Sequence, residues 1–386
     1  MADVSNVVFA AALAWHGAVD LAEGRGERGP WQQNESRYDY VDDPAVALDE
    51  RGAPAVVWVD QGRKDVFFDG VNVSRSPRTF SWLPRVALAQ NKVFVLWQEI
   101  IFSGGSHGGD ILFARSEDGG KTFSAPLNLS ASVAGDGKGR ITRDLWHNGS
   151  LDLAVGGDGT VYAAWTEYEG ALWLRRSHDG GRTFSDKQKI GGDDRLPARG
   201  PSLAVADRTV HLAWTDGDIH LATSTDGGAA FAAPRRLTRS RGYTDAPRLA
   251  LDPRGTLHLV YAESRQVMYR TADDAKARPI SGPGAGFPAI GTDANGGVYI
   301  TYELFPRDEE RPRGMGIAVS RDGGRSFSAP ETIPGSADAQ GAPNGSFQGL
   351  LMQKLAVNRH GELAVVNNSL KDGERSRVWL LRASPK

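Results

Sequence analysis

The 386-residue sequence contains no cysteine, which excludes disulfide frameworks, thiolate zinc sites and cysteine nucleophiles. It also has no excess of either charge, because 45 lysine and arginine residues stand against 47 aspartate and glutamate residues. Such a chain lacks the basic excess of a general nucleic-acid binder, so we expect no nucleic-acid partner. Long apolar runs are missing as well: the longest, Val7 to Trp15, is far too short to span a bilayer, so we expect no membrane span.

The apolar run near the N-terminus differs from the core of a signal peptide. Asp3 precedes it, no lysine or arginine does, and no small-residue cleavage pattern follows clearly. Two locations therefore stay open. We expect a periplasmic or secreted protein if a native signal peptide was removed before this numbering, and a cytoplasmic protein otherwise.

The sequence is rich in glycine and tryptophan, with 47 and 10 residues, a mixture typical of short strands joined by tight turns. One motif occurs four times, as SEDGGKTF, SHDGGRTF, STDGGAAF and SRDGGRSF, with its aspartate at Asp118, Asp179, Asp226 and Asp322. These aspartates are 61, 47 and 96 residues apart, and 96 is twice 48, so we infer a decayed copy around Asp273. In a tight turn the carboxylate accepts hydrogen bonds from turn amides, and glycine allows positive φ. We therefore expect the four aspartates to be structural.

A second repeat alternates with the first and consists of a strand, a turn and a strand that ends in an aromatic residue. Clear copies are PAVALDERGAPAVVW, PSLAVADRTVHLAW and PRLALDPRGTLHLVY, and a worn copy begins at Gln353. There are seven such hairpins, each followed by a third strand. With the aspartate turn and a short fourth strand, each unit has roughly 40–50 residues, the size of a propeller blade.

These repeats predict an all-β fold, a single β-propeller of four-stranded blades, with seven blades favoured over six. We expect the blades to occupy residues 37–386 and residues 1–36 to be a segment that closes the ring. The last unit stops after its third strand, at Val378 to Arg382, and Val7 to Leu13 would supply the missing strand and remove the exposed edges. A short N-terminal helix is the alternative interpretation of Val7 to Leu13.

The four motifs resemble the Asp boxes of the sialidase and BNR-repeat superfamily, and the resemblance covers nearly the whole chain. It implies a β-propeller whose active site lies on the face opposite the aspartate turns. It also implies a sialidase-like glycoside hydrolase that acts on an anionic glycan containing sialic or uronic acid. Sialidases hold the substrate carboxylate with three arginines and use a tyrosine–glutamate pair and an acid/base aspartate. Where one of those arginines would precede a proline by two residues, this sequence has Trp82, while Arg199 has a comparable position in a later unit.

The residues that we expect to do chemistry are those that break the repeat. The first break is RDLWHN, residues 143–148, where other units have an apolar sequence that contains proline. Tryptophan suits a sugar face, histidine transfers protons, and asparagine and arginine bind hydroxyls and carboxylates. We therefore predict that His147 is catalytic and that Arg143, Trp146 and Asn148 bind substrate. The alternative is a tryptophan that plugs the central channel and a histidine that bonds to the next blade.

The second break is Arg199, two residues before Pro201. Other units have a different residue at this position: Asp42, Trp82, Asp245 or Gly286. A guanidinium at the mouth of the channel suits a substrate carboxylate, so we predict that Arg199 is catalytic. A salt bridge to nearby carboxylates is the alternative.

The third break is the pair Tyr243 and Asp245, which is mirrored by Tyr40 and Asp42 in the first unit. A tyrosine acts as a base or nucleophile if a neighbouring carboxylate or arginine lowers its pKa. We predict that Tyr243 is catalytic and that Tyr40, Asp42 and Asp245 bind substrate. Because the pair occurs twice, a structural role is the alternative.

A carboxylate follows the second-strand aromatic by two residues in five units, at Asp60, Glu99, Glu167, Asp216 and Glu263. These residues either form an acidic ring that holds a cation or, as we favour, bond to the backbone of a neighbouring blade. The eight histidines are scattered, without HxxxH or HxH spacing. We therefore expect no metal and no cofactor.

Two alternatives to the hydrolase stay open. The stretch DLWHNGSLDLAV resembles a sequence that leads into an inner strand of some BNR-type propellers, including ulvan lyases. This resemblance implies a polysaccharide lyase in which His147 is the base, Tyr243 the acid, and Arg199 the group that neutralises the uronate. The other alternative is a propeller that binds a glycan or a protein without catalysis, because fold does not imply function. We expect an anionic glycan as partner and leave the oligomeric state open.

Overall fold

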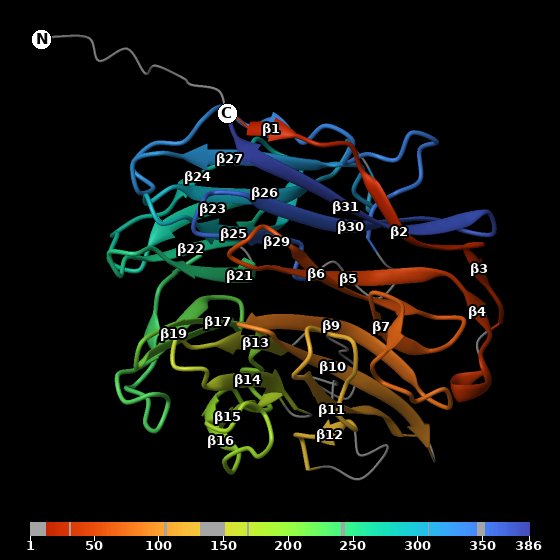
Figure 1. Cartoon of the computed structure of the whole chain (residues 1–386). Helices are drawn as coiled ribbons and strands as arrows, with labels where there is room; N and C mark the ends of the chain where they lie inside the picture. The colour runs from red at the N-terminus through yellow and green to blue at the C-terminus, as the bar shows by residue number, and fades with distance from the viewer. Residues whose placement is uncertain are drawn as a thin grey trace, which may run out of the picture.

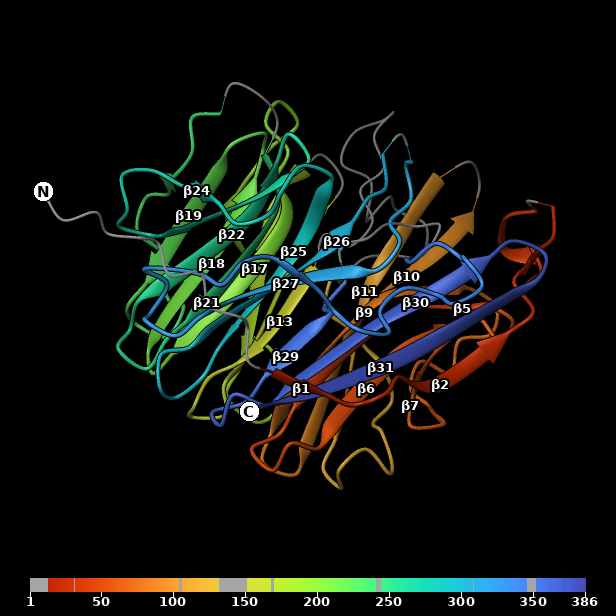
Figure 2. The same ribbon diagram turned by 90° about the horizontal axis from the view of Figure 1, so that it is seen from above.

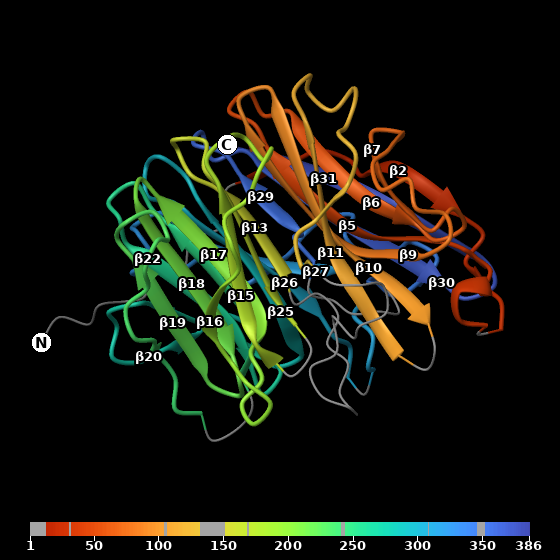
Figure 3. The same cartoon turned by 90° about the horizontal axis from the view of Figure 1, so that it is seen from below.

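Seven antiparallel sheets form a closed ring, which confirms the prediction of a seven-bladed β-propeller. The computed structural model describes residues 13–30, 32–103, 106–131, 151–167, 170–240, 244–307, 309–345 and 352–386. Figures 1, 2 and 3 show the molecule from three sides. None of the helices in these ranges is long and apolar enough to cross a membrane.

The first six blades contain four strands each, in chain order from the central axis to the rim. Blade 1 consists of β5 (Val41–Leu48), β6 (Pro54–Asp60), β7 (Asp65–Phe68) and β8 (Val71–Asn72). Blade 2 consists of β9 (Phe80–Ala89), β10 (Lys92–Ser103), β11 (Ser106–Ser116) and β12 (Leu127–Asn128). Blade 3 consists of β13 (Leu151–Val155), β14 (Val161–Thr166), β15 (Leu172–Ser177) and β16 (Gln188–Gly191). The long strands of blade 2 lie side by side in Figure 3.

The next three blades repeat this order. Blade 4 consists of β17 (Arg199–Ala206), β18 (Thr209–Thr215), β19 (Ile219–Ser224) and β20 (Arg235–Arg236). Blade 5 consists of β21 (Thr244–Leu251), β22 (Leu257–Glu263), β23 (Gln266–Thr271) and β24 (Arg278–Pro279). Blade 6 consists of β25 (Ala285–Thr292), β26 (Val298–Leu304), β27 (Met315–Ser320) and β28 (Glu331–Thr332).

Both ends of the described chain build blade 7. Its strands are β29 (Leu355–Val357), β30 (Leu363–Lys371), β31 (Arg375–Pro385), β1 (Leu13–Trp15) and β2 (Val19–Gly24). Both N-terminal strands pair with β31, and Figure 1 shows them in red beside the blue C-terminal strand. The N-terminal segment therefore closes the ring, as predicted, but with residues 13–24. Residues 7–12 of the predicted closing strand lie outside the described residues.

A short connection leads from blade 7 into blade 1. It contains the two-stranded ladder of β3 (Glu27–Arg28) and β4 (Tyr38–Asp39) and the 3-10 turn η1 (Gln33–Glu35). The chain then enters β5, the innermost strand of blade 1. Each innermost strand contacts the innermost strands of both neighbouring blades. We call the face where these strands begin the leading face, and the opposite one the turn face.

The four SxDGG turns lie on the turn face, between the third and fourth strands of blades 2, 3, 4 and 6. In blade 3, Asp179 Oδ1 accepts hydrogen bonds from the amide of Thr183 at 2.9 Å and from Ser177 Oγ at 2.8 Å. The amide of Gly181 donates to Ser177 Oγ at 2.8 Å. The same bonds recur around the other three aspartates, Asp118, Asp226 and Asp322. The turn near Asp273 in blade 5 has no glycine, and there Asp274 Oδ2 accepts the amide of Thr271.

The second glycine of each SxDGG turn packs on an aromatic ring of the preceding blade. Gly181 has a φ of +80°, and a Cβ atom there would lie 2.7 Å from the ring of Phe113. Gly228 is placed likewise against the ring of Tyr162, at 3.2 Å. Two reasons therefore favour glycine at this position of the turn: its left-handed backbone conformation and the close approach between blades.

We predict that Gly181→Ala lowers the free energy of unfolding by about 2 kcal/mol, because the new methyl group is strained at positive φ and collides with Phe113. Chemical denaturation monitored by tryptophan fluorescence measures the loss. Gly157→Ala is the matched control, since a Cβ there meets nothing within 4 Å. Equal stability of the two variants would contradict the assigned role of the turn.

The turn carboxylates also predict how stability depends on pH. Hydrogen bonds from Thr122 and Ser116 lower the pKa of Asp118 to about 2, below that of an unfolded aspartate near 3.9. The stability that Asp118 contributes is therefore complete above about pH 4 and is lost as the pH falls toward 2. We expect the difference in melting temperature between the wild type and Asp118→Asn to shrink between pH 5 and pH 2. A difference that stays constant over this range would refute the assignment.

Candidate functional site on the leading face

Five innermost strands share the same bend on the leading face. In each, the residue before a proline has positive φ: Asp43 (48°), Leu83 (52°), Gly200 (55°), Ala246 (52°) and Phe287 (47°). The register of each strand against the second strand shifts at this point. Proline disfavours the right-handed helical conformation for the residue before it. The hydrogen bonds of the surrounding ladder keep that residue in the left-handed conformation instead. The bend therefore gives the residue two before each proline an equivalent place at the mouth of the axis.

The position two before the proline holds Asp42 in blade 1, and Asp42 is completely buried together with Tyr40. Asp42 Oδ1 accepts a hydrogen bond from Gln61 Nε2 at 3.0 Å. Burial, with the neighbouring carboxylate of Asp43, raises the pKa of Asp42 well above its usual range. This half of the mirrored pair therefore faces protein rather than solvent, and its role in substrate binding stays a prediction.

Sequence analysis missed a buried ion pair whose lysine feels the charge of Asp43, the residue after Asp42. Lys354, before β29, bonds to Glu303 at the end of β26, and both residues are buried. Asn367 Nδ2 donates to the same Glu303 oxygen at 2.8 Å. Arg311 attracts the carboxylates of both Glu303 and Asp42, and it is half-buried. These charges therefore fix the wall of the axis between blades 6, 7 and 1.

Two arginines of the leading face share one carboxylate. The Arg85 guanidinium lies 3.9 Å from Asp152 Oδ1, and its Nη1 donates to the carbonyl of Pro84 at 3.1 Å. Burial lowers the pKa of Arg85 to about 10. The charge of Asp152 also acts on Arg248, while its Oδ2 accepts the amide of Leu203 at 2.7 Å. Both arginines are therefore engaged with the protein itself.

Arg199 and Asp245 have equivalent places on β17 and β21, which are adjacent innermost strands. Neither side chain is fully buried. Asp245 Oδ1 accepts the amide of Ala246 at 2.8 Å, and no described residue donates to its Oδ2. The structure therefore places one predicted cation and one predicted carboxylate at equivalent positions of neighbouring blades on the leading face.

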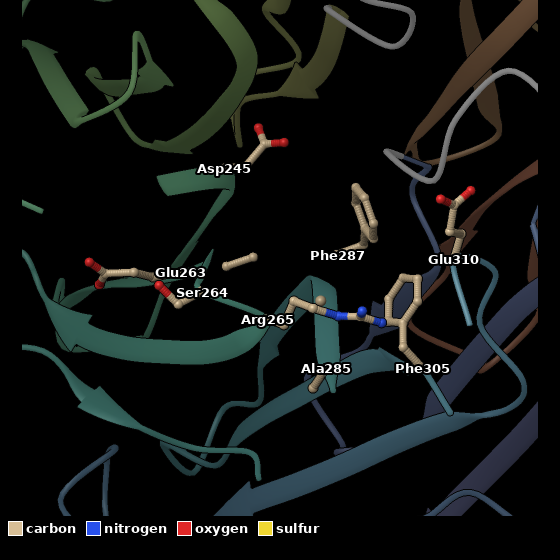
Figure 4. A pocket seen from close by; sticks show the side chains of 10 residues that line it. Asp245, Glu263, Ser264, Arg265, Ala285, Phe287, Phe305 and Glu310 are labelled. Atoms are coloured by element: carbon tan, nitrogen blue, oxygen red, sulfur yellow. The ribbon is translucent and has the colours of Figure 1, made fainter. Parts of the chain in front are cut away.

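Asp245 lines a pocket of about 370 Å³ between blades 5 and 6 (Figure 4). The pocket also contains the rings of Phe287 and Phe305, whose centroids are 6.1 Å apart. Arg265 lies over the Phe305 ring, 5.2 Å from its centroid, and its Nη2 donates to the carbonyl of Glu309 at 3.0 Å. Sequence analysis missed both phenylalanines; the signal for Phe287 was a large aromatic directly before the bend proline.

Five predicted site residues fall outside the described residues: Arg143, Trp146, His147, Asn148 and Tyr243. Their roles stay predictions.

Of the carboxylates that follow the second-strand aromatic, Glu99 and Glu167 bond within their own blades, whereas Glu263 accepts from Ser240 in the connection after blade 4. Glu99 Oε2 accepts from Trp97 Nε1 at 2.9 Å, and Glu167 Oε1 from Trp165 Nε1 at 3.1 Å. Lys187 Nζ adds a bond to Glu167 at 2.9 Å. No group of three or more histidine, aspartate or glutamate side chains among the described residues is arranged to hold a metal ion.

Several solved β-propellers that act on carbohydrates are similar to this chain. An α-L-arabinanase from Penicillium chrysogenum has a TM-score of 0.51 and 16% identity, over 78% of this chain and 92% of that one. The NanB sialidase from Streptococcus pneumoniae has a TM-score of 0.52 and 9% identity, over 79% and 68%. An ulvan lyase has a TM-score of 0.51 and 10% identity, over 95% of both chains. At these identities the likeness shows the propeller fold.

No family model and no curated protein matches the sequence.

We predict that Lys354→Met lowers the free energy of unfolding by roughly 3–5 kcal/mol, because it leaves the Glu303 carboxylate buried without its cation. Thermal and chemical denaturation measure the loss. The double variant Lys354→Met with Glu303→Leu removes both charges and should recover most of the stability. A single variant as stable as the wild type would show that the pair does not hold the axis wall.

Proposed function

We propose that the protein is a carbohydrate-active enzyme that breaks a glycosidic linkage in an anionic glycan at the leading face. The observation that carries the proposal is the neighbouring placement of Arg199 and Asp245, beside a pocket with two aromatic rings. A guanidinium suits a sugar carboxylate, and aromatic rings with carboxylates suit a sugar ring and its hydroxyls. The similar propellers support the same class of activity, since they include a sialidase, an arabinanase and a polysaccharide lyase.

Within this class, we favour β-elimination on a uronate-containing polysaccharide. Arg199 is our candidate for neutralising a substrate carboxylate, because it begins the innermost strand of blade 4 on the leading face and is only partly buried. Elimination needs one such cation, whereas sialidases use three arginines. The ulvan lyase also matches 95% of each chain, while the match to the sialidase covers 68% of that protein.

The proposed elimination assigns one step to each predicted catalytic residue. Arg199 binds the uronate carboxylate and makes the proton on the adjacent carbon more acidic. His147 removes this proton, a carbon–carbon double bond forms, and the bond to the leaving glycosidic oxygen breaks. Tyr243 donates a proton to that oxygen. Arg143, Trp146 and Asn148 bind the sugars on either side of the cleaved bond.

Hydrolysis is the second candidate, and a specific observation favours it. The pocket is lined by the acidic residues Asp245 and Glu310, and glycoside hydrolases generally work with two carboxyl groups, one as the acid and one as a base or nucleophile. A hydrolase would release an intact reducing end without forming a double bond. The two reactions therefore differ in their products.

The test incubates the protein with sialosides and with uronate-containing polysaccharides. It measures free sialic acid, reducing ends and the ultraviolet absorbance of unsaturated uronate in parallel. We expect absorbance to rise together with reducing ends, and His147→Ala to slow both by about 10²–10⁴-fold, the usual contribution of a general base. His178→Ala, an exposed histidine on the turn face, is the matched control and should keep wild-type activity.

The other results have equally clear meanings. Reducing ends without absorbance would establish hydrolysis, and free sialic acid would establish a sialidase. Cleavage that His147→Ala leaves intact would remove that residue from the mechanism. If no substrate is cleaved, the enzyme proposal fails and a propeller that only binds a glycan or protein takes its place.

A further inference from the structure

We propose that the pocket between blades 5 and 6 binds an uncharged sugar of the glycan, next to the acidic sugar held at Arg199. This inference rests on the proposed function and adds the class of the neighbouring sugar. It follows from the size of the pocket, its charge and the partly exposed ring of one phenylalanine. The volume of about 370 Å³ is within the usual range for small-ligand pockets, roughly 300–1,000 Å³.

The charges of the pocket oppose an anionic sugar. Two carboxylates face it, those of Asp245 and Glu310, against the single cation of Arg265, while the Glu263 carboxylate points away and accepts from Ser240 Oγ. That cation is engaged, because it lies over the Phe305 ring and donates to the carbonyl of Glu309. A uronate or a sulfated sugar in the pocket would therefore face an excess of negative charge. The hydroxyls of a neutral sugar would instead donate charge-assisted hydrogen bonds to these carboxylates.

The Phe287 ring provides an apolar face in the same pocket. Figure 4 shows Asp245 and Glu310 on either side of this ring, with Arg265 and Phe305 close by. Carboxylates beside an aromatic ring match a pyranose or furanose, which has an apolar C–H face and hydroxyls around its edge. The arrangement therefore provides both kinds of contact that a neutral sugar needs.

The backbone of Phe287 is unfavourable for a side chain of this size. Its φ of +47° disfavours a bulky residue, and the equivalent position in blade 4 is Gly200, which adopts +55° without strain. Phe287 is also only partly buried, so packing in the core does not account for it. Asp43, Leu83 and Ala246 adopt the same φ in three other bends, so this backbone belongs to the fold. What distinguishes Phe287 is that its bend presents a large, partly exposed ring to the pocket.

The charge pattern of the two positions defines the substrate class. Arg199 and Asp245 begin adjacent blades, so a glycan that crosses from blade 4 to blade 5 passes from a cation to the carboxylates of the pocket. We therefore infer a substrate in which uncharged sugars alternate with, or flank, acidic sugars. A homopolymer of uronates would place a charged sugar in the acidic pocket and bind poorly.

The test uses saturation-transfer NMR with methyl glycosides at millimolar concentration. The neutral probes are methyl glycosides of glucose, galactose, rhamnose, xylose and arabinose, and the acidic probes are those of glucuronate and galacturonate. We expect transfer to at least one neutral probe, and Phe287→Gly should weaken its binding by about tenfold, equivalent to about 1.4 kcal/mol. The melting temperature should not fall, because glycine relieves the strained φ. Phe231→Ala, a ring from a turn on the opposite face, is the matched control and should leave the transfer unchanged.

A second variant tests the charge argument. Asp245→Asn with Glu310→Gln keeps the shape of the pocket but removes two negative charges, so acidic probes should gain transfer that depends on Phe287. The inference is overturned if no neutral probe shows a signal that Phe287→Gly removes, or if acidic probes already depend on Phe287 in the wild type. These measurements do not involve cleavage. A failed enzyme proposal, seen as no product from any polysaccharide, is therefore distinguishable from a failed sugar pocket.

Discussion

The contact between a glycine and an aromatic ring of the preceding blade sets the spacing of the propeller. Gly181 on Phe113 brings the turn backbone closer to the neighbouring blade than a residue with a Cβ allows, and Gly228 on Tyr162 makes a contact that a Cβ would crowd. The Ser–Asp pair of each turn holds that glycine in place through bonds of 2.7–3.0 Å. These contacts join neighbouring blades on the turn face, opposite the face that carries the candidate site.

The bend before each proline has a complementary role on the leading face. Each of five innermost strands has one such bend. The two residues before the proline therefore reach the mouth of the axis in each of these blades. The fold is thereby free to change the chemistry from blade to blade while the backbone stays constant. Asp42 is buried against Gln61, Arg199 and Asp245 are partly exposed, and Phe287 faces a pocket. The chemistry of the leading face therefore depends on which side chain each blade has at the bend.

The fold could be predicted from the sequence because its signals are local. Seven hairpins and four SxDGG turns each lie within about 50 residues, and their count gives the number of blades. The site was less predictable. Arg199 and Asp245 were found because their distance from a proline repeats, whereas Lys354 and Glu303 meet across 51 residues without any shared pattern. Arg311 and Phe305 follow β26 in a loop, and spacing along the chain does not tell which loops fold inward.

Closure of the ring by both ends of the described chain has a consequence for biosynthesis. Leu13 pairs with Pro385, so blade 7 cannot be completed until the C-terminal strand has left the ribosome. Until then β1 and β2 lack their partner, and the nascent propeller is an open arc whose unpaired strand edges can pair with other chains. Contacts of such high contact order also form slowly. The eleven residues of β31 therefore decide whether the other six blades become a closed ring or an aggregation-prone intermediate.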